Sequence, residues 1–284
     1  MPTQLIVNAD DYGRTTSVSA GIRHAHLQGI VTSTTTMMNM VGIEEALEKA
    51  QEECPNLGLG VHLVLTAGEP VLPDSIVPTL TGGSGHFPSA DGFLNLLSQI
   101  DPDQVRSEWD AQIQKFIHLT GNKPDHLDSH HHTSYFTLSL FEIMLEFARE
   151  LGCAIRPPLA EGNSEMPLDL PPEFGKQAMD FLPPLLKRYK PICPENFYSS
   201  FYDETANFNN LINILSNLPI GTSEMMCHPG FVDQELISGS SYNVKRKNEL
   251  DLLANPVIIS FIRDHDIHLI NYSQLSNFSS QDGQ

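Results

Sequence analysis

The chain has 284 residues, 35 of them acidic and 16 basic, which gives a formal net charge of −19 with histidine neutral. This balance argues against a nucleic-acid partner, because neutralising phosphates requires clustered Lys and Arg, and the longest basic run is only Lys245-Arg246-Lys247. Hydrophobic residues make up 40% of a chain long enough to bury a large core, so the composition excludes a mostly disordered protein.

The first part of the chain alternates between strand-like and helix-like segments, each bounded by a recognisable signal. Apolar or β-branched runs predict strands over residues 5–7, 31–36 and 59–65. Helical patterns with an N-cap residue before them, or a proline or glycine after them, cover residues 18–28, 43–54 and 102–121. Residues 66–92 are rich in proline and glycine and predict a long irregular segment, which is typical of a functional loop or lid.

The second part continues the same alternation. Strands are predicted over residues 126–132, 154–156, 197–202, 223–227 and 267–270, and helices over residues 136–151, 173–188, 205–217 and 247–264. These segments make seven or eight β/α units with no composition break between them. We therefore expect one α/β domain over residues 1–275, folded as a single distorted (β/α) TIM-like barrel, with a polar, frayed tail over residues 276–284. Polar clusters at the ends of several strands favour this barrel over a doubly wound sheet, because a barrel gathers its catalytic groups there.

The apolar runs and the cysteines of the sequence indicate the cellular compartment. No apolar run approaches the roughly 20 residues that cross a bilayer, and the N-terminus lacks the basic and apolar regions of a secretory signal. The four cysteines share no C-x-x-C spacing, which argues against a disulfide framework or a thiolate zinc site. We therefore expect a cytoplasmic protein with no membrane partner.

The first polar cluster is Asn8-Ala9-Asp10-Asp11-Tyr12-Gly13, where the first strand ends. Adjacent carboxylates on a regular strand point to opposite faces, but at a strand-to-turn transition Asp10 and Asp11 can both reach one pocket. The alternative interpretation is an Asx turn formed by Asp11 and Gly13.

Two other strands end in a histidine. His62 lies in the third strand, where a lone histidine is more often a hydrogen-bonded core residue than a ligand. His228 follows Cys227 at the end of the seventh strand, and because strand neighbours face opposite sides, the two cannot form a thiol–imidazole pair. His228 is therefore better interpreted as a separate acid or base.

The fourth strand carries the most polar segment, His126-Leu127-Asp128-Ser129-His130-His131-His132. With a period of two, His126, Asp128, His130 and His132 share one face, which is unfavourable in a core unless these groups are paired or bind a metal. Imidazole and carboxylate are ligands of Zn²⁺ and related ions, and a second carboxylate can orient a ligating histidine. A solvated edge strand is the alternative.

Five segments, in this order, resemble the YdjC-like (ChbG) carbohydrate deacetylase family. They are NADDYG at residues 8–13, TSTTTMMN at 32–39, GVHLVLT at 60–66, HLDSHHH at 126–132 and EMMCHPG at 224–230. The resemblance implies a (β/α) barrel that removes acetyl groups from N-acetylated sugars and holds one divalent metal ion with an aspartate and two histidines. Only Tyr12 departs from the motifs, at a position where phenylalanine is common, and this leaves the chemistry untouched.

Carried onto this sequence, the resemblance implies that Asp11, His62 and His130 bind the metal, that Asp10 is the general base and that His228 is the general acid. Strand geometry excludes only His131 from the shared face, so the preference for His130 over His132 depends on the resemblance. By ligand type the ion is Zn²⁺ or Mg²⁺, with Mn²⁺, Ni²⁺ and Co²⁺ also compatible. We also expect a homodimer, the commonest symmetric assembly.

Other residues are candidates for contacting the sugar. Arg156, at the end of the fifth strand, could orient Asp10 or contact substrate, with a surface arginine as the alternative. Asn39 could donate a hydrogen bond to a sugar hydroxyl or amide. Tyr12 and Tyr135 are among the aromatic residues available to stack on a pyranose ring.

The predicted function is hydrolysis of the N-acetyl amide of an N-acetylglucosamine-type sugar or short chitooligosaccharide, giving acetate and an amine. One alternative is a glycoside hydrolase that draws a carboxylate pair from Asp10, Asp11 and Asp128, although such enzymes seldom need several histidines. A second alternative is a metal-containing sugar-binding protein without turnover, which would need neither a base nor an acid.

Overall fold

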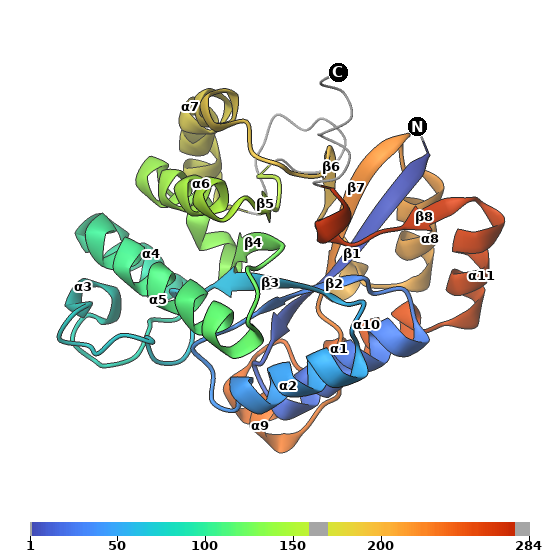
Figure 1. Ribbon diagram of the computed structural model, residues 1–284, viewed down its shortest axis with the longest axis horizontal. Coiled ribbons are helices and arrows are strands. Elements are labelled where there is room, and N and C mark those ends of the chain that lie inside the picture. The colour runs from blue at the N-terminus through green and yellow to red at the C-terminus, as the bar shows by residue number, and fades with distance from the viewer. Residues whose placement is uncertain (1, 159–169, 276–284) are drawn as a thin grey trace.

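The strands form one curled, parallel sheet in the computed structural model, which describes residues 2–158 and 170–275 (Figure 1). The order of its neighbours is β5-β4-β3-β2-β1-β7-β6, and β8 pairs with β1 beside this path. The strands are β1 (Thr3–Tyr12), β2 (Ser33–Thr36), β3 (Gly58–Leu63), β4 (His126–Ser129), β5 (Ala154–Ile155), β6 (Asn196–Tyr198), β7 (Gly221–Cys227) and β8 (Ile267–Leu269).

The sheet curls without closing into a barrel. In the described residues β5 and β6 share no ladder, and the Ile155 amide of β5 instead donates a hydrogen bond of 2.9 Å to the Ile192 carbonyl, in the segment before β6. Both strands are short, with two and three residues, so neither can extend a regular ladder. The predicted distorted (β/α) barrel is therefore confirmed as an α/β fold with a curled parallel sheet, a half-barrel rather than a closed one.

Helices surround the strands (Figure 1). The helices α10, α1, α2, α5, α6 and α7 contact one another in that order. The N-cap residues Thr15 and Asp101 accept hydrogen bonds from the first turns of α1 and α5. The helices are α1 (Thr16–Gln28), α2 (Ile43–Glu53), α3 (Pro78–Thr81), α4 (Ala90–Leu96), α5 (Pro102–Thr120), α6 (Leu138–Leu151), α7 (Pro172–Tyr189), α8 (Phe208–Ser216), α9 (Gln234–Gly239), α10 (Val244–Leu253) and α11 (Pro256–Asp264).

The predictions for residues 247–264 and 66–92 differ from the structure. The single helix expected over residues 247–264 is two helices, α10 and α11, because Pro256 cannot continue a helix and instead occupies the first position of the next. The segment 66–92 is not wholly irregular, since it contains α3 and the first residues of α4.

The interior of the curled sheet changes from apolar to charged along β1. Leu5 and Val7 belong to the large core shared with the helices, whereas Ile6 packs with Tyr272 in a small separate cluster. Because side chains alternate along a strand, Asn8 and Asp10 follow Ile6 on the interior face. The carboxyl ends of the strands therefore carry the polar groups, above an apolar base.

None of the helices within the described ranges combines the length and apolar character that crossing a bilayer requires. The four cysteines are free thiols. The predicted frayed tail over residues 276–284 lies outside the described part of the chain.

Candidate metal and active site

The carboxylates of Asp10 and Asp11 reach one site because the backbone of β1 changes conformation at its end. Asp11 has a φ of 71°, in the left-handed region, and the pairing of β1 with β2 shifts register between Ala9 and Tyr12. A regular strand would send adjacent side chains to opposite faces. Instead both carboxylates are buried and line the same cavity, as a strand-to-turn transition predicts.

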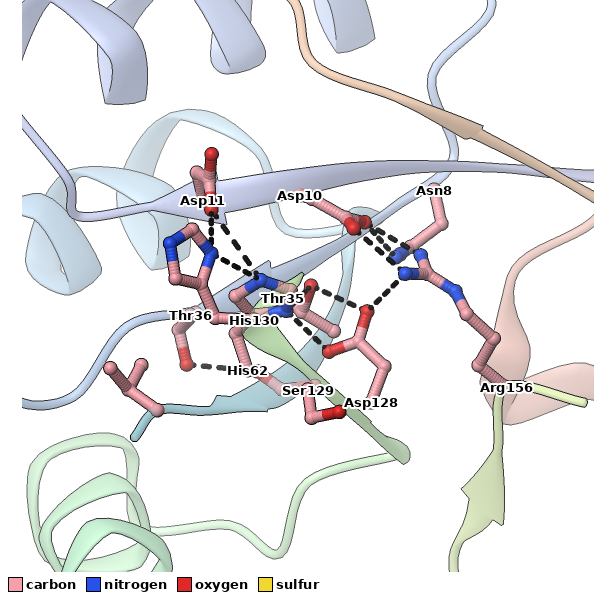
Figure 2. A network of polar contacts seen from close by, with 12 residues as sticks. Asn8, Asp10, Asp11, Thr35, Thr36, His62, Asp128, Ser129, His130 and Arg156 are labelled. Carbon is pink, nitrogen blue, oxygen red and sulfur yellow. Dashed lines mark hydrogen bonds and ion pairs between the residues drawn. The ribbon is translucent and has the colours of Figure 1, made fainter. Parts of the chain in front are cut away.

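Asp11, His62 and His130 form a compact group at the ends of β1, β3 and β4 (Figure 2). The Asp11 Oδ1 atom lies 3.4 Å from His62 Nε2 and 3.1 Å from His130 Nδ1. The two imidazole nitrogens are 3.3 Å apart. Although Asp11 Oδ1 is buried, it has no hydrogen-bond partner among the described residues. An unpartnered carboxylate oxygen facing two imidazoles fits a divalent cation by both donor type and geometry.

The protonation states of the two histidines differ. Burial lowers the pKa of His130, which keeps its imidazole neutral. Burial acts on His62 in the same direction, but Asp128 and Asp11 overcome it and raise the pKa of His62 to about 10. The proton on His62 therefore partly balances the surrounding carboxylates, and a cation would have to replace it.

Asp128 and Thr35 orient the His62 ring (Figure 2). The Asp128 Oδ1 atom lies 2.6 Å from His62 Nδ1, and the Thr35 hydroxyl donates to Asp128 Oδ2 at 3.0 Å. This arrangement leaves Nε2 of His62 facing Asp11. A carboxylate behind a histidine is the usual support for a metal-binding imidazole. Gly60, two residues earlier in β3, lets the neighbouring strand approach closely, since a Cβ there would lie 2.5 Å from the His126 ring.

Asp10 is held by Arg156, which reaches it from the end of β5 (Figure 2). Two parallel hydrogen bonds run from Arg156 Nη1 and Nη2 to the Asp10 carboxylate, at 2.7 and 2.6 Å. The same guanidinium contacts Asp128 at 3.1 Å and Glu224 at 2.9 Å. Arg156 is fully buried, so the surface-arginine interpretation is wrong and the expected contact with Asp10 is present.

Arg156→Met is expected to lower the free energy of unfolding by about 3–5 kcal/mol, because it leaves three buried carboxylates without their shared cation. Urea unfolding followed by circular dichroism measures the change. Arg188→Met is the matched control, because its ion pair with Glu142 lies at the surface with Arg188 67% exposed and should contribute less than about 1 kcal/mol. Equal, small losses in both variants would contradict this prediction.

His228 follows β7 and joins the same group. Its Nε2 atom lies 3.9 Å from Asp10 Oδ2, and its Nδ1 atom is buried with no partner in the described part of the chain. Burial lowers the pKa of His228 to about 4, although Asp10 and Asp11 act in the opposite direction. His228 is therefore neutral near pH 7 and has free capacity to accept a proton.

The histidine run leaves strand geometry after Ser129, so the predicted strand over 126–132 is too long and the expected shared face is wrong. His131 and His132 have φ angles of 51° and 56°, in the left-handed region, and lie in a 3₁₀ turn. His131 Nδ1 is 3.0 Å from the Thr66 hydroxyl, and burial lowers the pKa of both histidines. Of the three consecutive histidines, His130 alone belongs to the group around Asp11.

These groups line a cavity of about 350 Å³ at the carboxyl edge of the sheet. One part of its wall is apolar, with Phe93 and Phe136, and another carries Arg14, Tyr202 and Tyr242. A cavity that combines an apolar wall with several convergent polar groups is typical of a small-molecule site.

Three residues that the sequence suggested as sugar contacts do not line the cavity. Tyr12 and Tyr135 are fully buried, and their hydroxyls donate to the carbonyls of Ala46 and Arg156, so neither ring can stack on a ligand. The Asn39 amide donates to the carbonyls of Ala67 and Glu69 at 2.7 and 3.0 Å. Asn39 thus holds the segment after β3 and is absent from the residues that line the cavity.

Helix α10 contributes two buried charged residues that the sequence analysis missed. Arg246 Nη2 donates to Asp11 Oδ2 at 2.5 Å, on the oxygen that does not face the imidazoles. Glu249 accepts a hydrogen bond of 2.5 Å from the backbone amide of His228. A signal was present in the sequence: Arg246, Leu250 and Leu253 have the i, i+4, i+7 spacing of one buried helix face.

The amino-acid sequence matches the family described as YdjC-like protein over residues 4–264. The chain belongs to the YdjC-like family. This confirms the resemblance drawn from the five motifs. The YdjC-like chain is 37% identical over 273 residues to a carbohydrate deacetylase of Thermoanaerobacter pseudethanolicus, covering 95% of this chain and 98% of the relative. It is 33% identical over 275 residues to a chitooligosaccharide deacetylase of Proteus mirabilis, with 95% and 98% covered.

A solved structure of a protein from Enterococcus faecalis V583 is similar to this chain in both sequence and fold. It is described as that of a candidate cellobiose-phosphate cleavage protein, is 31% identical, and superimposes with a TM-score of 0.84 over 97% of this chain and 99% of that one. The YdjC-like chain therefore shares both its sequence family and its complete fold with proteins that carry carbohydrate names. The roles of its individual site residues remain predictions.

Proposed function

We propose that this YdjC-like protein is a metal-dependent carbohydrate deacetylase. It hydrolyses the N-acetyl amide of an N-acetylglucosamine-type sugar or short chitooligosaccharide and releases acetate and an amine. The observation that carries the proposal is the grouping of Asp11, His62 and His130 around an unpartnered carboxylate oxygen, next to Asp10 and His228. The deacetylase names of its relatives support the same reaction.

Asp11, His62 and His130 are the residues that would hold the ion. An aspartate and two imidazoles suit Zn²⁺, and the carboxylate also admits Mg²⁺, Mn²⁺, Co²⁺ or Ni²⁺. When bound, the ion supplies a positive charge that polarises the amide carbonyl and makes the attacking water more acidic. Asp128 keeps Nε2 of His62 directed at this position, and Arg246 occupies the other oxygen of Asp11.

Asp10 and His228 handle the proton in this proposal. Asp10 takes one proton from the attacking water, while Arg156 fixes the direction of its carboxylate. An amine leaves only after its nitrogen is protonated. His228 Nε2 lies 3.9 Å from Asp10 Oδ2, so the proton would reach His228 through one water and then pass to the leaving nitrogen. Because His228 is neutral before the reaction, it acts as a donor only after receiving a proton.

The electrostatics of Asp11 and Asp128 argue against their use as the acid of glycoside hydrolysis. That reaction needs a carboxyl group that still holds a proton near neutral pH. Burial raises the pKa values of Asp11 and Asp128, but Arg246 and His62 reverse this and lower both below the usual value. Neither carboxyl group is therefore suited to act as the acid.

Removal of divalent metal is expected to abolish release of acetate, because the reaction would lose the charge that polarises the amide. The protein is dialysed against a chelator, then supplied separately with Zn²⁺, Mg²⁺, Mn²⁺, Co²⁺ and Ni²⁺. Mass spectrometry follows acetate and amine formation from N-acetylglucosamine and its β-1,4-linked disaccharide and trisaccharide.

Three outcomes would contradict the proposal. Full activity in demonstrably metal-free protein would remove the metal from the mechanism. New reducing ends without acetate would identify a glycosidase. Tight sugar binding by calorimetry with no product under any metal would indicate a binding protein.

A further inference from the structure

Tyr202 is the most exposed of the phenylalanine and tyrosine side chains that line the cavity. The phenylalanines of the same wall, Phe93 and Phe136, are 1% and 8% exposed, whereas Tyr202 is 37% exposed. An aromatic ring that stays open inside a cavity keeps its face available for an apolar surface of a ligand. Tyr202 lies just after β6, outside the group of proposed metal ligands.

The ring of Tyr202 is held in place by its neighbours. It stacks on Tyr242 with the ring centroids 4.4 Å apart and the planes 25° from parallel. The Tyr242 hydroxyl donates to Glu249, a buried carboxylate on α10, and accepts a hydrogen bond of 3.1 Å from the Asp203 amide. A ring fixed from behind loses little conformational freedom when a ligand binds to its open side.

The position of Tyr202 relative to His228 defines what it would contact. The two rings meet edge to face, with centroids 5.1 Å apart. In the proposed reaction His228 protonates the leaving nitrogen, so the sugar that carries this nitrogen lies on the His228 side of the cavity. The acetyl group lies on the opposite side, toward Asp11. Tyr202 is therefore next to the sugar and not next to the acyl group.

We infer that Tyr202 is a substrate-binding residue whose ring stacks on the apolar face of the sugar that bears the acetamido group, or of the sugar linked to it. This inference rests on the proposed deacetylase function and adds its sugar-binding surface. The C–H groups of one pyranose face supply the apolar area, and the ligand needs no charge at this contact.

Three substitutions at Tyr202 test the inference. Tyr202→Ala is expected to raise KM for the N-acetylated disaccharide about tenfold with kcat changed less than threefold, because the contact acts on binding and not on the chemical step. Tyr202→Phe should keep KM within twofold of the unchanged protein, since the ring remains. Tyr202→Leu keeps apolar bulk without a ring and should fall between them.

The matched control is Phe208→Ala. Phe208 has the same exposure, 38%, and lies on neighbouring α8 but does not line the cavity, so its removal should leave KM unchanged. A second readout needs no turnover: saturation-transfer NMR of metal-free protein with the disaccharide should show transfer to the sugar ring protons, weakened in Tyr202→Ala. Circular dichroism of each variant checks that it is folded.

The outcomes separate this inference from the proposed function. If the unchanged protein releases no acetate under any metal, the proposed function fails. If it does release acetate and Tyr202→Ala has unchanged KM and unchanged saturation transfer, the inference fails. A fall in kcat with constant KM would also overturn it, because Tyr202 would then act through His228 instead of through the sugar.

Discussion

Asp10→Asn is expected to lower kcat by about 10²–10⁴-fold, the range that a well-positioned general base contributes. Asparagine preserves the shape of the side chain and one acceptor for Arg156, but it cannot take a proton from water. The metal affinity should change less than tenfold, because Asp10 is outside the proposed ligand group of Asp11, His62 and His130. Steady-state kinetics and metal titration calorimetry on the same preparation measure the two effects.

Glu224→Gln is the matched control for Asp10→Asn. Glu224 is a second carboxylate of the same buried network and contacts the Arg156 Nε atom at 2.9 Å, but it does not line the cavity. Its substitution removes the same charge from Arg156 without touching the proposed base. A similar loss of kcat in both variants would mean that Asp10 acts only as a structural partner of Arg156, which would contradict its proposed role.

The convergence of the site could be predicted from the sequence because parallel strands bring their carboxyl ends to one edge. Asp11, His62 and His228 each end a strand or follow one, so their meeting required only the correct strand assignment. The buried pair of Arg156 and Asp10 follows from the same rule, since Arg156 comes directly after the short strand β5. These predictions depended on chain order and period, which the sequence contains.

The sequence-based predictions that were wrong concern features that depend on backbone conformation and on contacts with residues distant in the chain. The period-two rule assigns His132 to the face of His130 only while the strand continues, and nothing in the run of histidines reports that it ends at Ser129. The exposure of a tyrosine side chain also cannot be predicted from the sequence. Tyr12 is fully buried and its hydroxyl donates to the Ala46 carbonyl, whereas Tyr202 is exposed. The predicted distorted barrel is a half-barrel, in which the short strands β5 and β6 share no ladder.

Because β4 ends at Ser129, substitutions of the three consecutive histidines that follow it are expected to differ strongly in their effect on metal affinity. His130→Ala is expected to weaken metal binding by more than about 100-fold, because it removes one of three ligands, a larger loss than removing an outer partner. His131→Ala and His132→Ala should each change the affinity less than tenfold. Metal titration calorimetry, with metal content after dialysis, compares the three variants.

The two neighbours of His130 make this a sharp comparison, because all three substitutions remove one imidazole from the same turn. His131 contacts the Thr66 hydroxyl and its ring centroid lies 3.9 Å from that of His130, whereas His132 packs near Tyr135 and Phe197. Neither of these two imidazoles belongs to the group around Asp11. A general disturbance of the turn would therefore weaken metal binding in all three variants. Loss of the metal in His132→Ala with retention in His130→Ala would place the ion elsewhere, and the proposed arrangement around Asp11 would then be wrong.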